Sequence, residues 1–139
     1  KIAAQSGAFN GFPGQKYPNL MLFFGVPTPG HDNEEVQAAI REEIERIKTE
    51  LISDGELAKV KTRAKASLVR SLDSNMGIAR QLGYYQGIFG NWQELFRRVE
   101  RIDALTKEDV QRVAQETFKD TNRTVAMLYT ETETDEGTN

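Results

Sequence analysis

The one histidine of the chain, His31, is the residue whose surroundings come nearest to a metal site. It opens the sequence HDNEE at residues 31–35, so Glu34 stands where the zinc motif H-x-x-E-H has its glutamate, while Glu35 replaces the second histidine. A catalytic zinc ion needs about three protein ligands and an open position for water. The acidic residues also suit a helix N-terminus, where negative charge is stabilising. We therefore predict that His31 lies at the beginning of a helix and ligates no metal.

Other reactive residue types lack the partners that catalysis requires. The chain has no cysteine, and every serine would depend on His31 as its imidazole base. Ser53 and Ser74 are better explained as N-caps of helices. Acidic residues are abundant but fall on polar helix faces, so an independent enzyme with a carboxylate pair is the least favoured alternative. We predict no catalytic, substrate-binding or metal-binding residue in this chain.

The composition indicates one globular domain. The chain has 139 residues, and its 28% charged residues mix both signs to a net charge of −3. Without a basic stripe, nucleic acid is not an expected partner, and no apolar run approaches the ~20 residues of a membrane helix. The lack of cysteine suits periplasm and cytoplasm equally, so localisation stays open. Because the first residue is Lys1 rather than Met, we expect a piece of a longer protein.

Two apolar segments at the beginning predict an antiparallel pair of strands at about residues 1–12 and 18–27. A third strand is predicted at about 123–129, where TVAMLY has the alternation of a half-buried strand. Three strands make a thin sheet, so we expect at least one further strand, from sequence before Lys1 or from a partner chain. Residues 131–139 are acidic and small, and we predict a disordered tail.

Five helices are predicted between the second and third strands, from apolar residues spaced three and four apart. They cover about residues 33–52, 54–72, 74–89, 91–101 and 106–118. Three pairs have the spacing of a capping box, in which the first residue and the third after it satisfy each other's backbone N–H groups. These pairs are Asp32 with Glu35, Ser53 with Glu56, and Thr106 with Asp109.

Two groups of side chains on these helices have an alternative as binding surfaces. The basic face of the second helix is interpreted as a solvated surface, with a binding patch as the alternative. Aromatic residues around Gly90 are expected in the core, with a patch for a partner domain or subunit as the alternative. The basic residues are Lys59, Lys61, Arg63, Lys65 and Arg70, and the aromatic ones are Tyr84, Tyr85, Phe89, Trp92 and Phe96.

The order of strand, strand, helices and strand predicts an α+β domain with its helices packed on one face of an antiparallel sheet. Several motifs then carry a family resemblance: FPG at 12–14, YPNL at 17–20, GVP at 25–27, DGEL at 54–57, LTKEDV at 105–110 and NRTV at 122–125. In this order they resemble the C-terminal domain of the insulinase/pitrilysin family of zinc peptidases, in the bacterial branch related to mitochondrial processing peptidase. The resemblance extends to about Tyr129.

The resemblance implies a metallopeptidase α/β roll of the LuxS and processing-peptidase type, with residues 1–130 as a C-terminal domain that is incomplete at its N-terminus. In that family the zinc motif lies in another domain, so we expect zinc in the parent or partner chain and no cofactor here. The family also has an Arg…Tyr pair that binds substrate. Its arginine would precede Lys1 and its tyrosine would fall near Ala4, so the chain does not carry the pair.

The leading hypothesis is a non-catalytic domain of a zinc metallopeptidase subunit, one that shapes the substrate chamber and packs against other domains. Its expected partners are a sister domain, a partner peptidase subunit and, through the full-length protein, a peptide substrate. The alternative is a scaffold or assembly subunit with the same fold and no peptidase activity. Because a sheet without its first strands exposes an edge and an apolar face, self-association is also expected.

Overall fold

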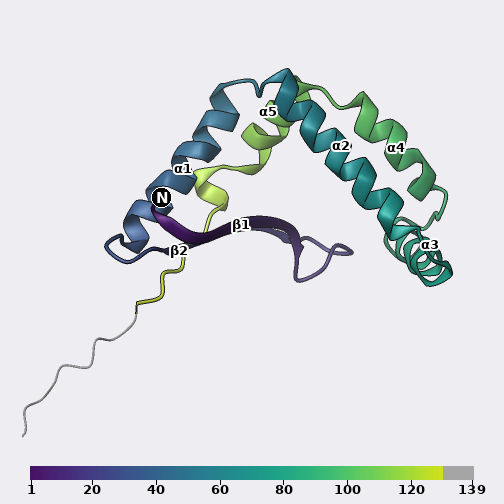
Figure 1. Ribbon diagram of the computed structural model, residues 1–139, viewed down its shortest axis with the longest axis horizontal. Helices are drawn as coiled ribbons and strands as arrows, with labels where there is room; N and C mark the ends of the chain where they lie inside the picture. The colour runs from purple at the N-terminus through teal and green to yellow at the C-terminus, as the bar shows by residue number, and fades with distance from the viewer. Residues whose placement is uncertain (130–139) are drawn as a thin grey trace, which may run out of the picture.

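The computed structural model describes residues 1–129 and contains two strands, five α-helices and a short 3-10 helix. In Figure 1 the helices form an arch above the strand pair, with α1 and α5 on one side and α2, α3 and α4 on the other. The predicted α+β class, with helices on one face of an antiparallel sheet, is confirmed. Within residues 1–129, no helix is both long enough and apolar enough to cross a lipid bilayer.

Strands β1 (Ala3–Phe12) and β2 (Leu20–Pro27) form the antiparallel sheet. Gly7 pairs with Phe24 and Phe9 with Leu22, and the register shifts between Asn10 and Phe12. Neither strand contains a charged residue. A sheet without charged residues is typical of a protein interior, yet this sheet has two strands.

Helix α1 (Asn33–Thr49) covers the upper face of the sheet at β2. Gly25 is required there, because a Cβ atom on it would overlap Cγ1 of Val36, which is buried. Phe23 points to the same side, two residues away, and packs edge-on against Phe118 with ring centroids 5.5 Å apart. Phe118 directly follows α5 (Lys107–Thr117), which also packs against α1.

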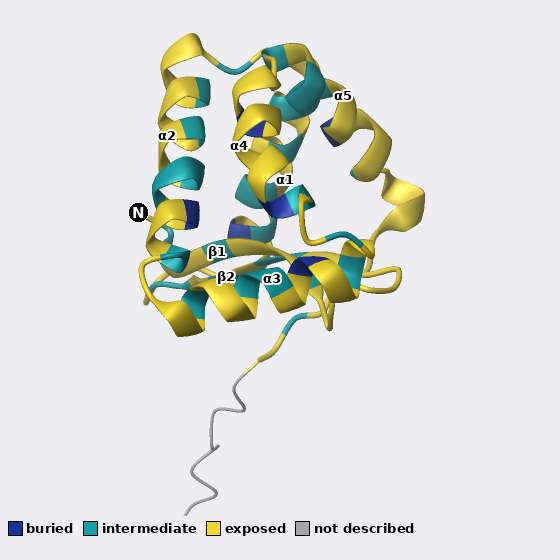
Figure 2. Cartoon of the chain, turned by 90° about the vertical axis from the view of Figure 1, so that its right-hand side faces the viewer, coloured by how far each residue is buried: buried dark blue, intermediate teal, exposed yellow. Residues whose placement is uncertain are grey.

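The other three helices pack on one another. Helices α2 (Asp54–Ser71), α3 (Asn75–Phe89) and α4 (Glu94–Ala104) surround a buried cluster of Leu68, Tyr85 and Leu95, one residue from each helix. Leu95 is the most deeply buried, with 1% of its surface exposed. Figure 2 shows that buried positions are few and that every helix has many exposed ones.

The predicted strand at 123–129 is wrong: these residues pair with no strand within residues 1–129. A strand needs a neighbour to satisfy its backbone groups, and this segment has side-chain partners on α1 at its far end instead. Asn33 donates to the Leu128 carbonyl oxygen, Nδ2 to O 2.9 Å, and Tyr129 donates to Glu34, Oη to Oε1 2.6 Å. The predicted tail at 131–139 lies outside the described residues.

Helix α4 begins three residues later than predicted, at Glu94. The Asn91 side chain accepts from the Gln93 backbone N–H at 3.0 Å, and it does so in a turn ahead of the helix. Gln93, the N-cap residue, makes no capping hydrogen bond with its side chain. The short 3-10 helix, Asp120–Asn122, lies between α5 and the segment at 123–129.

Candidate functional site

His31 lies directly before α1, as predicted. Its Nδ1 atom lies 2.6 Å from Oε2 of Glu35, and Oδ1 of Asp32 accepts from the Glu35 backbone N–H at 2.8 Å. Asp32 is therefore the N-cap, but the predicted capping box is incomplete, because the Glu35 carboxylate binds the imidazole. His31 and Glu35, which stand at the two histidine positions of the zinc motif, are therefore bonded to each other, and Glu34, at its glutamate position, accepts a hydrogen bond from Tyr129.

The donor set at this corner does not fit a zinc site. It offers one imidazole, whose Nδ1 is already bonded to Glu35, and a cap carboxylate that is bonded to a backbone N–H. Across residues 1–129, no three His, Cys, Asp or Glu side chains are grouped so that they could hold an ion. The residues around His31 therefore do not supply the ligand set that a zinc site requires.

The same end of α1 holds the C-terminal segment through Asn33 and Glu34. The hydrogen bond from Tyr129 to Glu34 raises the pKa of the Tyr129 hydroxyl, because the neutral phenol is the form that donates. The partners lie 95 residues apart in sequence. No spacing rule connects such positions, so the sequence analysis missed this contact.

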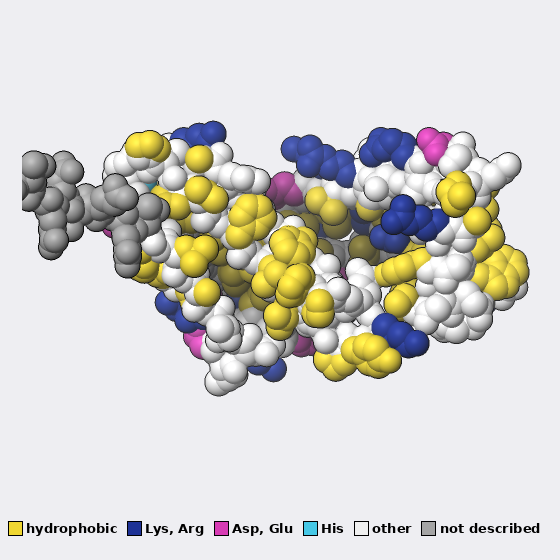
Figure 3. All heavy atoms as spheres, turned by 90° about the horizontal axis from the view of Figure 1, so that it is seen from below, with side chains coloured by type: hydrophobic (Ala, Val, Ile, Leu, Met, Phe, Trp, Pro, Cys, Tyr) yellow, Lys and Arg dark blue, Asp and Glu magenta, His cyan; other side chains and the backbone are white. Residues whose placement is uncertain are grey.

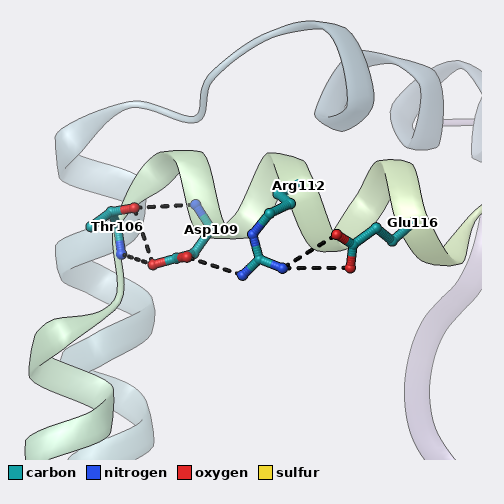
Figure 4. A network of polar contacts seen from close by, with 4 residues as sticks. All are labelled: Thr106, Asp109, Arg112 and Glu116. Atoms are coloured by element: carbon teal, nitrogen blue, oxygen red, sulfur yellow. Dashed lines mark hydrogen bonds and ion pairs between the residues drawn. The ribbon is translucent and has the colours of Figure 1, made fainter.

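Two capping boxes predicted from the sequence are confirmed, at the beginnings of α2 and α5. At α5, Thr106 and Asp109 satisfy each other's backbone N–H groups at 3.1 Å, and Arg112 joins Asp109 to Glu116 (Figure 4). The hydrogen bond from Arg112, followed by those from Thr106, holds the pKa of Asp109 below its usual range. At α2, hydrogen bonds from Ser53 lower the pKa of Glu56 in the same way.

The basic face of α2 is only partly a solvated surface. Lys61 donates to the Asp103 carbonyl oxygen at 2.8 Å, and Lys65 pairs with the Asp103 carboxylate. Both contacts bind α2 to the end of α4. These two lysines thus hold helices together, and the interpretation of a purely solvated face is corrected for them.

The aromatic residues around Gly90 are divided between core and surface. Tyr85 is buried, and its hydroxyl accepts from Arg98 at 2.8 Å. The others are exposed to different extents; Trp92 is 46% and Phe96 60% exposed. Their exposure corrects the prediction of an aromatic core, because within residues 1–129 α3 and α4 pack mainly on α2 and on each other. A shallow hollow of about 370 Å³ lies here, lined by Leu82, Gly83, Gln86 and Trp92.

The under face of the sheet, opposite α1, is a second apolar surface. Because side chains alternate along a strand, Phe24 and Val26 point away from α1 when Phe23 and Gly25 point toward it. The Phe24 ring lies over Gly7, so closely that a Cβ there would come within 2.7 Å of it. Apolar side chains gather on this side in Figure 3. We define the under face as Phe9, Phe12, Leu20, Phe24 and Val26, which are between 39% and 57% exposed.

No protein-family model matches the chain. A curated relative, the beta subunit of mitochondrial processing peptidase from Blastocladiella emersonii, is 37% identical over 68 residues. That match covers 49% of this chain and 15% of the relative. The chain therefore spans a small part of the curated protein that it resembles in sequence.

Solved structures agree over more of the chain. A protease from Helicobacter pylori is 28% identical with a TM-score of 0.75, over 87% of this chain and 29% of that one. Two structures below 25% identity share the fold. One is a candidate zinc protease from Bordetella pertussis Tohama I, which is 22% identical with a TM-score of 0.76, over 89% of this chain and 67% of that one. The other is the inactive peptidase domain of a candidate zinc protease from Bordetella parapertussis, which is 20% identical with a TM-score of 0.82, over 97% of this chain and 71% of that one.

These likenesses fall on proteases and peptidase subunits, and the structural ones extend over most of this chain. The chain is thus similar to peptidase domains of the insulinase and processing-peptidase type, in keeping with the C-terminal domain of the insulinase/pitrilysin family.

Proposed function

We propose that this chain is a non-catalytic domain of a zinc metallopeptidase subunit, one that shapes a peptide chamber by packing against other domains. The observation that carries the proposal is the match to the Helicobacter pylori protease, which extends over 87% of this chain but 29% of that protein. The chain therefore corresponds to one part of a larger protease.

The chemistry of the described residues supports a non-catalytic role. His31 is engaged by Glu35, and neither Ser53 nor Ser74 is a free nucleophile, because each caps a helix. Zinc would be held by residues of the parent or partner chain. The apolar under face and the exposed aromatic residues Trp92 and Phe96 supply surfaces on which other domains could pack.

Zinc titration with a peptidase assay tests the catalytic half of this proposal. We expect no stoichiometric zinc binding by the 139-residue chain, and no zinc-dependent cleavage of an unstructured peptide. His31→Gln is the matched variant, and it should behave like the unchanged protein. Tight binding of one zinc ion that His31→Gln removes, or turnover by the purified chain, would overturn the proposal.

The gene sequence upstream of the Lys1 codon distinguishes two forms of the parent. A motif H-x-x-E-H with a downstream glutamate there would identify a catalytic subunit. A homologous domain without that motif would identify the non-catalytic partner of such a subunit. A gene that encodes no peptidase-like domain at all would instead favour the scaffold alternative.

A further inference from the structure

Charge is distributed unevenly along the chain. Residues 54–104, which include α2, α3 and α4, contain nine Lys and Arg against six Asp and Glu, whereas the rest of the chain contains nine against fifteen. In Figure 3 the Lys and Arg side chains are accordingly more prominent on the right, where these three helices lie. The helical part therefore presents a positive surface within a chain of negative net charge.

The cations of α2 differ from those of α1 and α5 in their partners. Every Lys and Arg of α1 and α5 makes an ion pair with a carboxylate, such as Arg46 with Glu43. On α2, by contrast, Lys59, Arg63 and Arg70 make no ion pair and no side-chain hydrogen bond with any of residues 1–129. Cations four residues apart on a helix repel each other, so this arrangement does not stabilise the helix itself.

Lys59, Arg63 and Arg70, which we call the basic row, lie on one face of α2. Their spacing of four and seven residues places them within a narrow arc that points away from the buried contacts of α2 with α3 and α4. From its first to its last residue the row extends about 16 Å along the helix. Two exposed valines, Val60 and Val69, lie on either side of it. This face thus combines cations with apolar contact area, as the rims of protein interfaces do.

The charge of the basic row determines the chemistry of its occupant. An apolar layer on this face would bury unpaired charges, which is costly, so the occupant has to supply carboxylates or phosphates. The Glu56 carboxylate, on the same face of α2, already accepts hydrogen bonds from Ser53 in the capping box. Nucleic acid fits less well than protein, because three cations neutralise few phosphates and the affinity of nucleic acid depends on their number.

We propose that the basic row binds an acidic segment of another protein subunit. This inference rests on the proposed function, in which the domain packs against other parts of a peptidase, and it names the chemistry of one partner surface. Exposed ion pairs are weak singly and are screened by salt. The contact should therefore depend on all three cations together and on the ionic strength.

A short poly-glutamate peptide with a fluorescent label tests the basic row by fluorescence anisotropy. We expect the unchanged protein to bind it at low ionic strength, and salt to weaken the binding. A triple variant that reverses the charge of the row should bind about tenfold or more weakly. Its substitutions are Lys59→Glu, Arg63→Glu and Arg70→Glu.

The matched control reverses three other exposed cations that make no ion pair within residues 1–129, by the substitutions Lys1→Glu, Lys16→Glu and Lys119→Glu. It changes the net charge of the protein by the same amount but leaves the basic row intact. We expect it to bind poly-glutamate almost as well as the unchanged protein. Far-UV circular dichroism verifies that both triple variants are folded, since all six side chains are exposed.

Three outcomes would contradict the proposal. The first is that the unchanged protein does not bind poly-glutamate at low ionic strength, and the second is that both triple variants lose binding equally, which would show an effect of net charge alone. The third is that a short DNA duplex binds more tightly than poly-glutamate and loses its binding when the row is reversed. None of these outcomes bears on the zinc and peptidase assays, so the proposed function succeeds or fails separately.

Discussion

The two sides of the arch differ in how they satisfy their own backbones. Helices α2, α3 and α4 make their backbone hydrogen bonds internally, and they are held together by the cluster of Leu68, Tyr85 and Leu95 and by the contacts of Lys61 and Lys65 with Asp103. The side with the sheet buries Val36 and Ala114, but within residues 1–129 its two strands pair with each other and with no further strand. The helical side is therefore held by side-chain contacts among its own helices, whereas the sheet side has, within residues 1–129, backbone groups at its edges that no further strand pairs with.

The largest expected effect is on the helical side. Leu95→Ala removes the most deeply buried side chain and should lower the free energy of unfolding by about 2–5 kcal/mol. Denaturant unfolding followed by circular dichroism measures this loss. Leu105→Ala is the matched control, because Leu105 is half-exposed and should cost much less. Similar losses for the two variants would show that the cluster does not dominate the helical side.

A smaller effect is expected where the two layers of the sheet side meet. Gly25→Ala forces a methyl group against Val36 and should cost about 1–3 kcal/mol. Val36→Ala makes room for it, so the double variant should be less destabilised than the sum of the two single ones. Gly14→Ala, where a Cβ would meet nothing within 4 Å, is the control. Simple additivity would contradict a direct contact between Gly25 and Val36.

The capping box of α5 should contribute less to the free energy of unfolding than the buried contacts do. Thr106→Ala removes the acceptor of the Asp109 N–H and should cost about 1 kcal/mol by thermal or denaturant unfolding. Thr106→Ser keeps a hydroxyl oxygen and should restore most of the stability. If Thr106→Ser is as unstable as Thr106→Ala, the methyl group of threonine matters rather than the cap.

The smallest effect depends on pH. Because Asp109 has a lowered pKa in the folded protein, its ionised form stabilises the fold above the ordinary carboxyl range, near pH 4. That contribution is lost as the pH falls through the lowered value. Asp109→Asn should therefore lower Tm at neutral pH, and the difference from the unchanged protein should shrink on acidification toward pH 2. If the difference in Tm grows on acidification instead, the pKa of Asp109 is not lowered in the folded protein.

Local rules predicted the helices and the confirmed caps, because a helix and its first turn are determined within a few residues. Ser53 with Glu56 and Thr106 with Asp109 are examples. At Asp32 the predicted cap is present, but the return hydrogen bond of the capping box is not, because the Glu35 carboxylate binds His31 instead. The strand predicted at 123–129 failed for a different reason: alternation shows that a segment can be a strand, but pairing depends on a distant neighbour.

Burial was harder to predict than secondary structure. Tyr85 and Phe89 lie one helical turn apart in an apolar sequence, yet the first is buried and the second is 55% exposed. Periodicity identifies the apolar residues of a helix but not which of them will meet another element. The caps at Ser53 and Ser74 could be predicted, because capping requires only near neighbours.

Both ends of the described chain are held near the beginning of α1, one by the connection that precedes the helix and one by its first residue. Thr28 donates to the Lys1 carbonyl oxygen at 3.1 Å, and Asn33, five residues later, holds the Leu128 carbonyl oxygen at 2.9 Å. Chains whose ends lie together tolerate circular permutation and insertion into other proteins. The unit could thus be linked to a host through one corner, and a permuted chain that is opened at the exposed turn after Gly90 should keep both sides of the arch.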